Sequence, residues 1–178
     1  MALTGLGWCL FVLAHMLGNL LYLVGPAEYN NYGNNITGNK EFYYLAETGL
    51  VVMLTLHILM AIMIVLQNRR SRPIGYAVSP QRGEKSAATF ASRTMALSGT
   101  LVLVFIVFHL IHFRFGPEYP FMHKGQEIRD LARLMREFFQ SGTYVLGYVV
   151  CLTVRSFHLE HALWSALDRK STRLNSSH

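Results

Sequence analysis

The segment LTGLGWCLFVLAHMLGNLLYLV, residues 3–24, decides the fold class of this chain. It contains no Asp, Glu, Lys or Arg, and it has the length of roughly 20 apolar residues that crosses about 30 Å of hydrocarbon. A membrane span must satisfy its own backbone hydrogen bonds, so a segment of this length is predicted to be a helix. His15 lies within it.

Three other apolar segments have similar length, at residues 43–66, 94–113 and 142–163. Of the 178 residues, 52% are hydrophobic and 15% are charged, whereas a soluble domain has about 25% charged residues. This composition excludes a free soluble globule and a disordered chain. The net charge of +6 does not indicate nucleic-acid binding, because the bases lie between the apolar segments, as they do beside anionic lipid headgroups. We predict an all-α membrane protein with a transmembrane four-helix bundle.

The charges of the connections predict how the chain crosses the membrane. The first connection, residues 24–40, carries one base, Lys40. The second connection carries six: Arg69, Arg70, Arg72, Arg82, Lys85 and Arg93. Bases collect on the cytoplasmic side, so the second connection and the N-terminus are predicted to be cytoplasmic.

The third connection and the tail differ from the spans. Apolar residues of the connection follow helical spacing: Ile128, Leu131, Leu134, Met135 and Phe138. We predict a short amphipathic helix there, lying on the outer face of the membrane. After Leu167 the chain becomes DRKSTRLNSSH. Residues 1–167 are expected to form the membrane domain, and residues 168–178 a polar tail that is non-native or disordered. No internal repeat is obvious.

Histidines within the apolar segments are the main indication of function. Six of the eight histidines lie there: His15, His57, His109, His112, His158 and His161. Ionisable residues inside a membrane are rare and usually face the bundle interior or a cavity. A lone histidine is more often a hydrogen-bonding core residue than a ligand, but at least one in each of four helices is difficult to explain that way.

Depth sorts four of these histidines into two pairs. At roughly 1.5 Å per residue, His15 and His109 lie about 18 and 22 Å from the cytoplasmic edge, and His57 and His158 about 13 and 8 Å. We name His15 and His109 the outer pair, and His57 and His158 the inner pair. Two imidazole pairs at two depths are typical of two haems b stacked across a bilayer, each with two axial histidines.

Other residues compete with these ligands or assist them. His112 and His161 each lie three residues after a predicted ligand and are alternatives to it; each could instead hydrogen-bond a haem propionate or a quinone. Gly18 and Gly99 either leave space for the porphyrin rings or reflect the general abundance of glycine in membrane helices.

Two arginines are candidates for haem propionates. Arg155 lies one turn before His158 and needs an anion, which either a propionate or Glu160 would supply. Arg93, at the cytoplasmic start of its span, is either a second propionate partner or a snorkelling anchor.

Seven segments of the chain, taken in order, resemble a known family. They are MALTGL (1–6), FVLAHMLGNLLYL (11–23), LHILMAI (56–62), NRRSRPIGY (68–76), ASRTMALSG (91–99), FIVFHL (105–110) and FHLEHALWSAL (157–167). This set resembles the single-subunit, dihaem cytochrome b membrane anchor of bacterial succinate dehydrogenases and fumarate reductases. The resemblance covers nearly all of residues 1–167.

The resemblance implies a place in the respiratory chain and the tricarboxylic acid cycle. The anchor would lie in the bacterial inner (cytoplasmic) membrane and dock a flavoprotein subunit and an iron–sulfur subunit on its cytoplasmic side. Electrons from succinate would cross from the inner to the outer haem and reduce a menaquinone-type quinone, or run in reverse. Carried onto this chain, the family's ligands fall on the same inner and outer pairs that depth indicates. The chain has no flavin, nucleotide or iron–sulfur motif, so succinate chemistry is not expected on it.

Two positions depart from the family. After WSAL (164–167) the family continues into a fifth helix, which this sequence lacks, so we expect a fragment. Some members carry a proton-conducting glutamate two residues before the last haem ligand. Ser156 occupies that position here, so this proton pathway is not expected.

Two other interpretations stay open at this point. Another dihaem b-type membrane cytochrome, similar to cytochrome b561, would have the same histidine pairs but no flavoprotein partner. A haem-free transporter or structural membrane protein would use its histidines as polar contacts between helices. Copurification of a flavoprotein subunit would distinguish the succinate dehydrogenase anchor from a cytochrome b561-like protein. A haem spectrum would exclude the haem-free transporter or structural protein.

Overall fold

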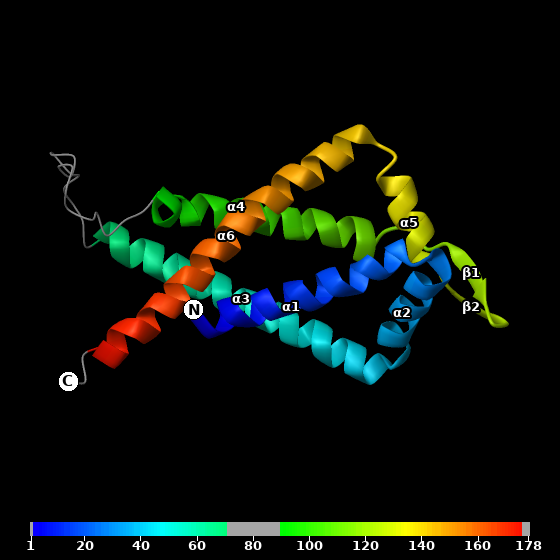
Figure 1. Ribbon diagram of the computed structural model, residues 1–178, viewed down its shortest axis with the longest axis horizontal. Helices are drawn as coiled ribbons and strands as arrows, with labels where there is room; N and C mark the ends of the chain where they lie inside the picture. Colours follow the sequence, from blue (N-terminus) through cyan, green and yellow to red (C-terminus); the bar gives the residue numbers. More distant parts are fainter. Residues whose placement is uncertain (1, 71–89, 176–178) are drawn as a thin grey trace.

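The computed structural model describes residues 2–70 and 90–175, most of which lie in four long helices (Figure 1). They are α1 (Ala2–Leu20), α3 (Lys40–Arg70), α4 (Phe90–His109) and α6 (Gly142–Asn175). A 3₁₀ turn, η1 (Leu21–Leu23), extends α1, and a π-helical turn, η2 (Leu110–Arg114), extends α4. The four apolar segments are therefore helical, as predicted.

Three of these helices are long and apolar enough to cross a membrane, at Leu3–Leu23, Lys40–Gln67 and Met95–Arg114. Very few of their residues are buried within the chain, as expected of surfaces that contact lipid. The helix α6 is equally long, but Arg155 and Glu160 interrupt its apolar sequence. The fold is mostly helical and consistent with an all-α membrane protein, while the fourth crossing stays a prediction.

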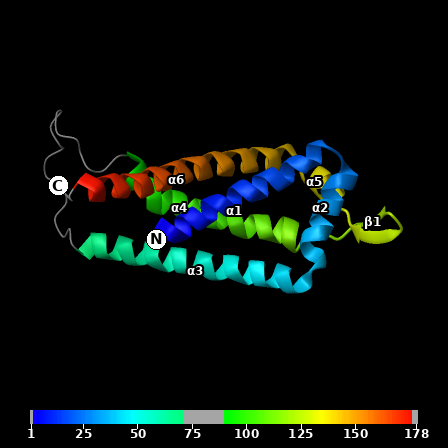
Figure 2. The same ribbon diagram turned by 60° about the horizontal axis from the view of Figure 1, so that its bottom comes forward.

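The long helices run along the length of the molecule and alternate in direction (Figure 2). Helix α1 packs on α3 and α6, and α4 packs on α6. The first and third connections gather at one end, which we call the hairpin end (Figure 1). The start of α1 and the last turns of α6 lie toward the opposite end, which we call the terminal end.

The first connection contains a helix that the sequence did not predict, α2 (Pro26–Gly38). Pro26 occupies its first turn and Glu28 follows in the same turn, two features that favour a helix start. The asparagines of this connection are poor helix formers, which is why composition alone suggests a loop. Packing of α2 against the third connection stabilises the helix despite this low propensity.

The third connection begins with a β-hairpin, which the all-α prediction did not include. Strands β1 (Pro120–His123) and β2 (Gln126–Arg129) pair antiparallel. Lys124 and Gly125 join them with φ angles of 49° and 81°, the left-handed pair that a two-residue hairpin turn requires. Ile128, expected in a helix, lies in β2 instead, because this turn pairs its strand before the helix begins.

The amphipathic helix predicted in the third connection is present as α5 (Leu131–Phe138). Asp130 caps it, since its Oδ1 accepts a hydrogen bond from Arg133 N at 2.9 Å. Ala132 and Leu134 are buried. The helix packs on α2, so the two connections together cover the hairpin end.

One side chain joins these connections: Asn30 of α2 is fully buried. Its Nδ2 donates to Asp130 Oδ1 at 2.8 Å, and its Oδ1 accepts from Ala132 N at 2.9 Å. Asn30 thereby binds Asp130, the residue that caps α5. It also binds the backbone N–H of Ala132 in the first turn of α5, where N–H groups have no partner within the helix.

An ion pair joins α3 to η2 at the same end. Arg114 Nε donates to Glu47 Oε1 at 2.8 Å, and its guanidinium lies 5.4 and 5.2 Å from the ring centroids of Tyr43 and Phe115. Both charged side chains are about one-third exposed, so the pair contributes at most about 1 kcal/mol to stability.

Helix α6 continues past the predicted domain boundary at Leu167. Its backbone is helical to Asn175, and the non-native origin of the tail stays a prediction. The helix continues for a local reason: DRKSTRLN contains neither proline nor glycine to end the helix. Residues 176–178 lie outside the described residues.

Candidate functional site

The structure brings the outer pair together. His15 of α1 and His109 of α4 have ring centroids 5.7 Å apart and ring planes at 87°. Phe11 stacks on His15, while Phe105 and Tyr148 contact His109. Two imidazoles that share one metal ion, each nitrogen at about 2 Å from it, have centroids about 6 Å apart. The observed spacing therefore suits a shared axial metal.

The inner pair consists of His57 on α3 and His158 on α6. Each ring meets a hydroxyl on a neighbouring helix. Thr4 Oγ1 lies 3.1 Å from His57 Nδ1, and Ser98 Oγ lies 3.0 Å from His158 Nδ1. Contacts of this kind orient an imidazole and leave Nε2 for a metal. The sequence did not predict that Thr4 and Ser98 contact these histidines. Many membrane spans contain an isolated Ser or Thr, so its presence alone does not indicate a partner.

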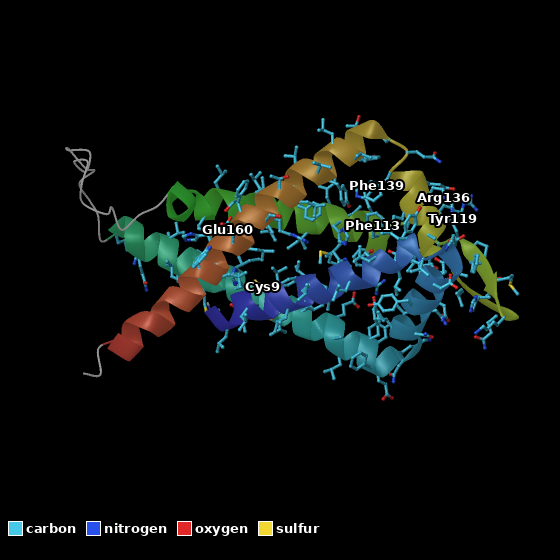
Figure 3. All side chains as sticks on the ribbon, in the orientation of Figure 1. Cys9, Phe113, Tyr119, Arg136, Phe139 and Glu160 are labelled. Atoms are coloured by element: carbon cyan, nitrogen blue, oxygen red, sulfur yellow. The ribbon has the colours of Figure 1, made fainter. Side chains whose placement is uncertain are left out.

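Arg155 lies close to the outer pair, although in the sequence it is one turn from His158. Its charge acts on both His15 and His109, and its Nε is buried without a hydrogen-bond partner among the described residues. Glu160 is exposed and lies further along α6 (Figure 3). In the described part of the chain no ion pair joins the two. Arg155 as a whole is only partly buried, so its guanidinium is within reach of an anionic partner.

The two competing histidines occupy different environments. His112 Nδ1 donates to Phe108 O at 2.7 Å, and its ring packs on Phe138 and Tyr144 at centroid distances of 4.5 and 5.6 Å. His112 thus contacts α5 and α6, whereas His109 is the histidine that meets the outer-pair partner on α1. His161 lies close enough to His158 to interact with it electrostatically.

The remaining predicted site residues have other settings. Arg93 lies in the first turn of α4, and its side chain is outside the described residues. A Cβ at Gly18 would collide with Tyr32 of α2, and a Cβ at Gly99 would lie 3.2 Å from His158 Cε1. The prediction that Gly18 makes room for a porphyrin is therefore wrong, since Tyr32 fills that space. Gly99 instead lets the His158 ring approach α4.

A hydrogen-bonded chain links α2 to the helix turn of His15. Tyr29 Oη donates to Asn19 Oδ1 at 2.8 Å, and Asn19 Nδ2 donates to His15 O at 2.7 Å. Burial raises the pKa of Tyr29, which keeps its hydroxyl protonated as a donor. The first connection thereby supports the backbone of an outer-pair histidine.

An apolar cavity of about 270 Å³ lies between α4, α5 and α6. Aromatic rings form most of its wall, with His112 and the Tyr148 side chain among them. Tyr148 Oη is buried and has no hydrogen-bond partner within the described ranges. Phe113 and Phe139, which are labelled in Figure 3, both contact Tyr148. Tyr148 also contacts His109, so the cavity adjoins the outer pair.

No protein-family model, curated protein or solved structure matches this chain. The chain's own residues and geometry therefore carry the functional assignment.

The outer pair has the ring spacing that a haem held by two imidazoles would need. His109 Nδ1 has no hydrogen-bond partner among the described residues, and the partly buried Arg155 would supply a cation for a carboxylate. The inner pair offers two rings whose Nδ1 atoms already have partners. No cluster of three or more metal-binding side chains occurs among the described residues, but a haem needs only two protein ligands.

Proposed function

We propose that this chain is the membrane-anchor cytochrome b subunit of a bacterial succinate:quinone oxidoreductase. The observation that carries the proposal is the placement of two histidine pairs on four helices, one histidine per helix. The outer pair is in ring contact and the inner pair has hydroxyl-supported rings. The ordered likeness to the family, from MALTGL to FHLEHALWSAL, supports the same function.

In this proposal the chain holds two redox centres in line across the inner membrane. His57 and His158 are the ligands of the inner haem b, and His15 and His109 those of the outer one. A bound haem supplies one-electron chemistry through its iron. Arg155 balances a propionate beside the outer pair. The flavoprotein and iron–sulfur subunits would dock at the terminal end, with the N-terminus cytoplasmic.

The cavity between α4, α5 and α6 is the proposed quinone site. A quinone ring is flat and apolar, and the cavity offers aromatic walls, with Tyr148 among the residues that line it. His112 donates from Nδ1 to Phe108 O, so its Nε2 is left as an acceptor for a quinol proton. The contact between Tyr148 and His109 places this site next to the outer haem ligands.

Gly147→Leu is expected to raise the KM for quinone about tenfold, a loss of about 1.4 kcal/mol in binding, without changing the haem content. Gly147 lines the cavity, and a Cβ there meets open space, so the new side chain fills the site without disturbing the fold. Gly49→Leu on α3 is the matched control, since its Cβ also meets nothing. Steady-state quinone kinetics of the complex would measure both; equal KM values in the two variants would contradict this site.

The function itself is tested by counting haem b per polypeptide in the purified chain with a pyridine haemochrome assay. Two haems are expected, together with copurification of a flavoprotein and an iron–sulfur protein from the native membrane. Two haems without these partners would favour the alternative, a cytochrome b561-like protein. A chain that binds no haem would refute both.

A further inference from the structure

The starts of the first and third spans carry the same short sequence. Residues 1–5 read MALTG and residues 95–99 read MALSG. In each, the hydroxyl residue precedes a histidine of the outer pair by eleven positions, at His15 and His109. The residues between the two copies differ, so the repeat is confined to these short segments. Contacts in the structure show what the repeated segment does.

Ser98 and Gly99 form a seat for the imidazole of His158. Ser98 Oγ lies 3.0 Å from His158 Nδ1. A Cβ added at Gly99 would lie only 3.2 Å from His158 Cε1, tighter than an ordinary carbon contact. The hydroxyl therefore binds one edge of the ring, and the absent side chain of Gly99 lets the ring lie against the backbone of α4.

A second hydrogen bond fixes the proton positions at this seat. Ser98 Oγ also donates to Met95 O at 3.2 Å. A hydroxyl has a single proton. When Ser98 donates it to Met95 O, the Ser98 oxygen accepts from His158, whose Nδ1 then carries the ring proton. A neutral imidazole with its proton on Nδ1 presents its lone pair at Nε2.

Thr4 and Gly5 make the corresponding contacts with His57. Thr4 Oγ1 lies 3.1 Å from His57 Nδ1, and a Cβ at Gly5 would lie 3.7 Å from His57 Cε1. Helix α1 thus seats the histidine of α3 as α4 seats the histidine of α6. The same hydroxyl–glycine pair recurs in both halves of the bundle.

We propose that Thr4, Ser98 and Gly99 are positioning residues that hold both inner-pair histidines as Nδ1–H tautomers, with each Nε2 available to a metal. The effect that this tautomer would have on a metal ligand rests on the proposed function, in which both histidines bind a haem. An imidazole that donates from its second nitrogen is a more basic ligand, which favours ferric iron and lowers the reduction potential. The outer pair differs, since His109 Nδ1 has no partner among the described residues.

Ser98→Ala in the haem-loaded chain should therefore change one haem only. The inner haem is expected to bind about tenfold more weakly and to shift to a more positive midpoint potential, while the outer haem keeps its potential. Ser98→Thr retains the hydroxyl and should restore both values. Thr100→Val is the matched control, because the Thr100 hydroxyl bonds Ala96 O of its own helix at 2.9 Å. Spectroscopic redox titration measures all four chains.

The haem-free chain in detergent provides a second readout, the ¹⁵N chemical shifts of its histidine rings. His158 should show a protonated Nδ1 and a bare Nε2 in the wild type, and a mixture of tautomers in Ser98→Ala. Identical ring shifts in Ser98→Ala and Thr100→Val would overturn the inference, whether or not haem binds. A wild-type chain that takes up no haem would instead refute the proposed function, and the ring shifts would still decide the tautomer.

Discussion

His109→Ala is expected to reduce the haem content from two haems b to one and to abolish electron transfer to quinone. His109 is the histidine whose ring meets His15, at a centroid distance of 5.7 Å, and an outer haem with one axial ligand would lose its hold on α4. The inner pair does not share this residue, so its haem should remain. The pyridine haemochrome assay and low-temperature spectra of the two haems would measure the loss.

His112→Ala is the matched control for this variant. His112 lies three residues further along the chain and packs on Phe138 and Tyr144 instead of His15. Its removal should leave two haems and impair only quinone turnover. The assignment of the outer ligands would be reversed if His112→Ala lost a haem while His109→Ala kept both.

Asn30→Ala is expected to lower the free energy of unfolding by about 3 kcal/mol, because it removes two buried hydrogen bonds and leaves Ala132 N–H and Asp130 without their partner. Asn30 is fully buried, so water cannot replace the lost amide without opening the contact between α2 and α5. The change should be measurable as a lower midpoint in denaturation of the purified protein in detergent.

Asn35→Ala, on the exposed side of the same helix, should change stability by less than about 0.5 kcal/mol. Similar losses in the two variants would show that helix propensity, and not the bonds of Asn30, is responsible. Asn30→Ala should keep both haems, since no histidine of either pair bonds to Asn30. Loss of haem in this variant would mean that the connections hold the spans together more strongly than proposed.

Helix positions and the candidate ligands were predictable because both depend on local sequence. Four uncharged or nearly uncharged segments of about 20 residues are expected to form helices in lipid, because a helix satisfies all of its own backbone hydrogen bonds. The rise per residue then assigns each histidine a depth. The amphipathic spacing of Leu131, Leu134 and Phe138 likewise predicted α5, with a boundary error at Ile128.

Other features could not be predicted because each depends on a partner distant in the sequence. Helix α2 has weak propensity and is held by α5, and the bonds of Asn30 reach Asp130 and Ala132 about a hundred residues away. Gly18 was expected to face a porphyrin, but the ring of Tyr32 lies against it. Ser98 resembles any other hydroxyl in a span until His158 is placed beside it.

The sequence by itself determined that this chain is helical and has apolar segments long enough to cross a membrane, and it predicted histidines at two levels, because hydropathy and helical rise are properties of consecutive residues. Only the tertiary structure decided that His109 and not His112 meets His15, that Arg155 lies beside the outer pair, and that hydroxyl–glycine seats hold the inner histidines. Those outcomes depend on how helices rotate and cross, which packing between distant segments sets.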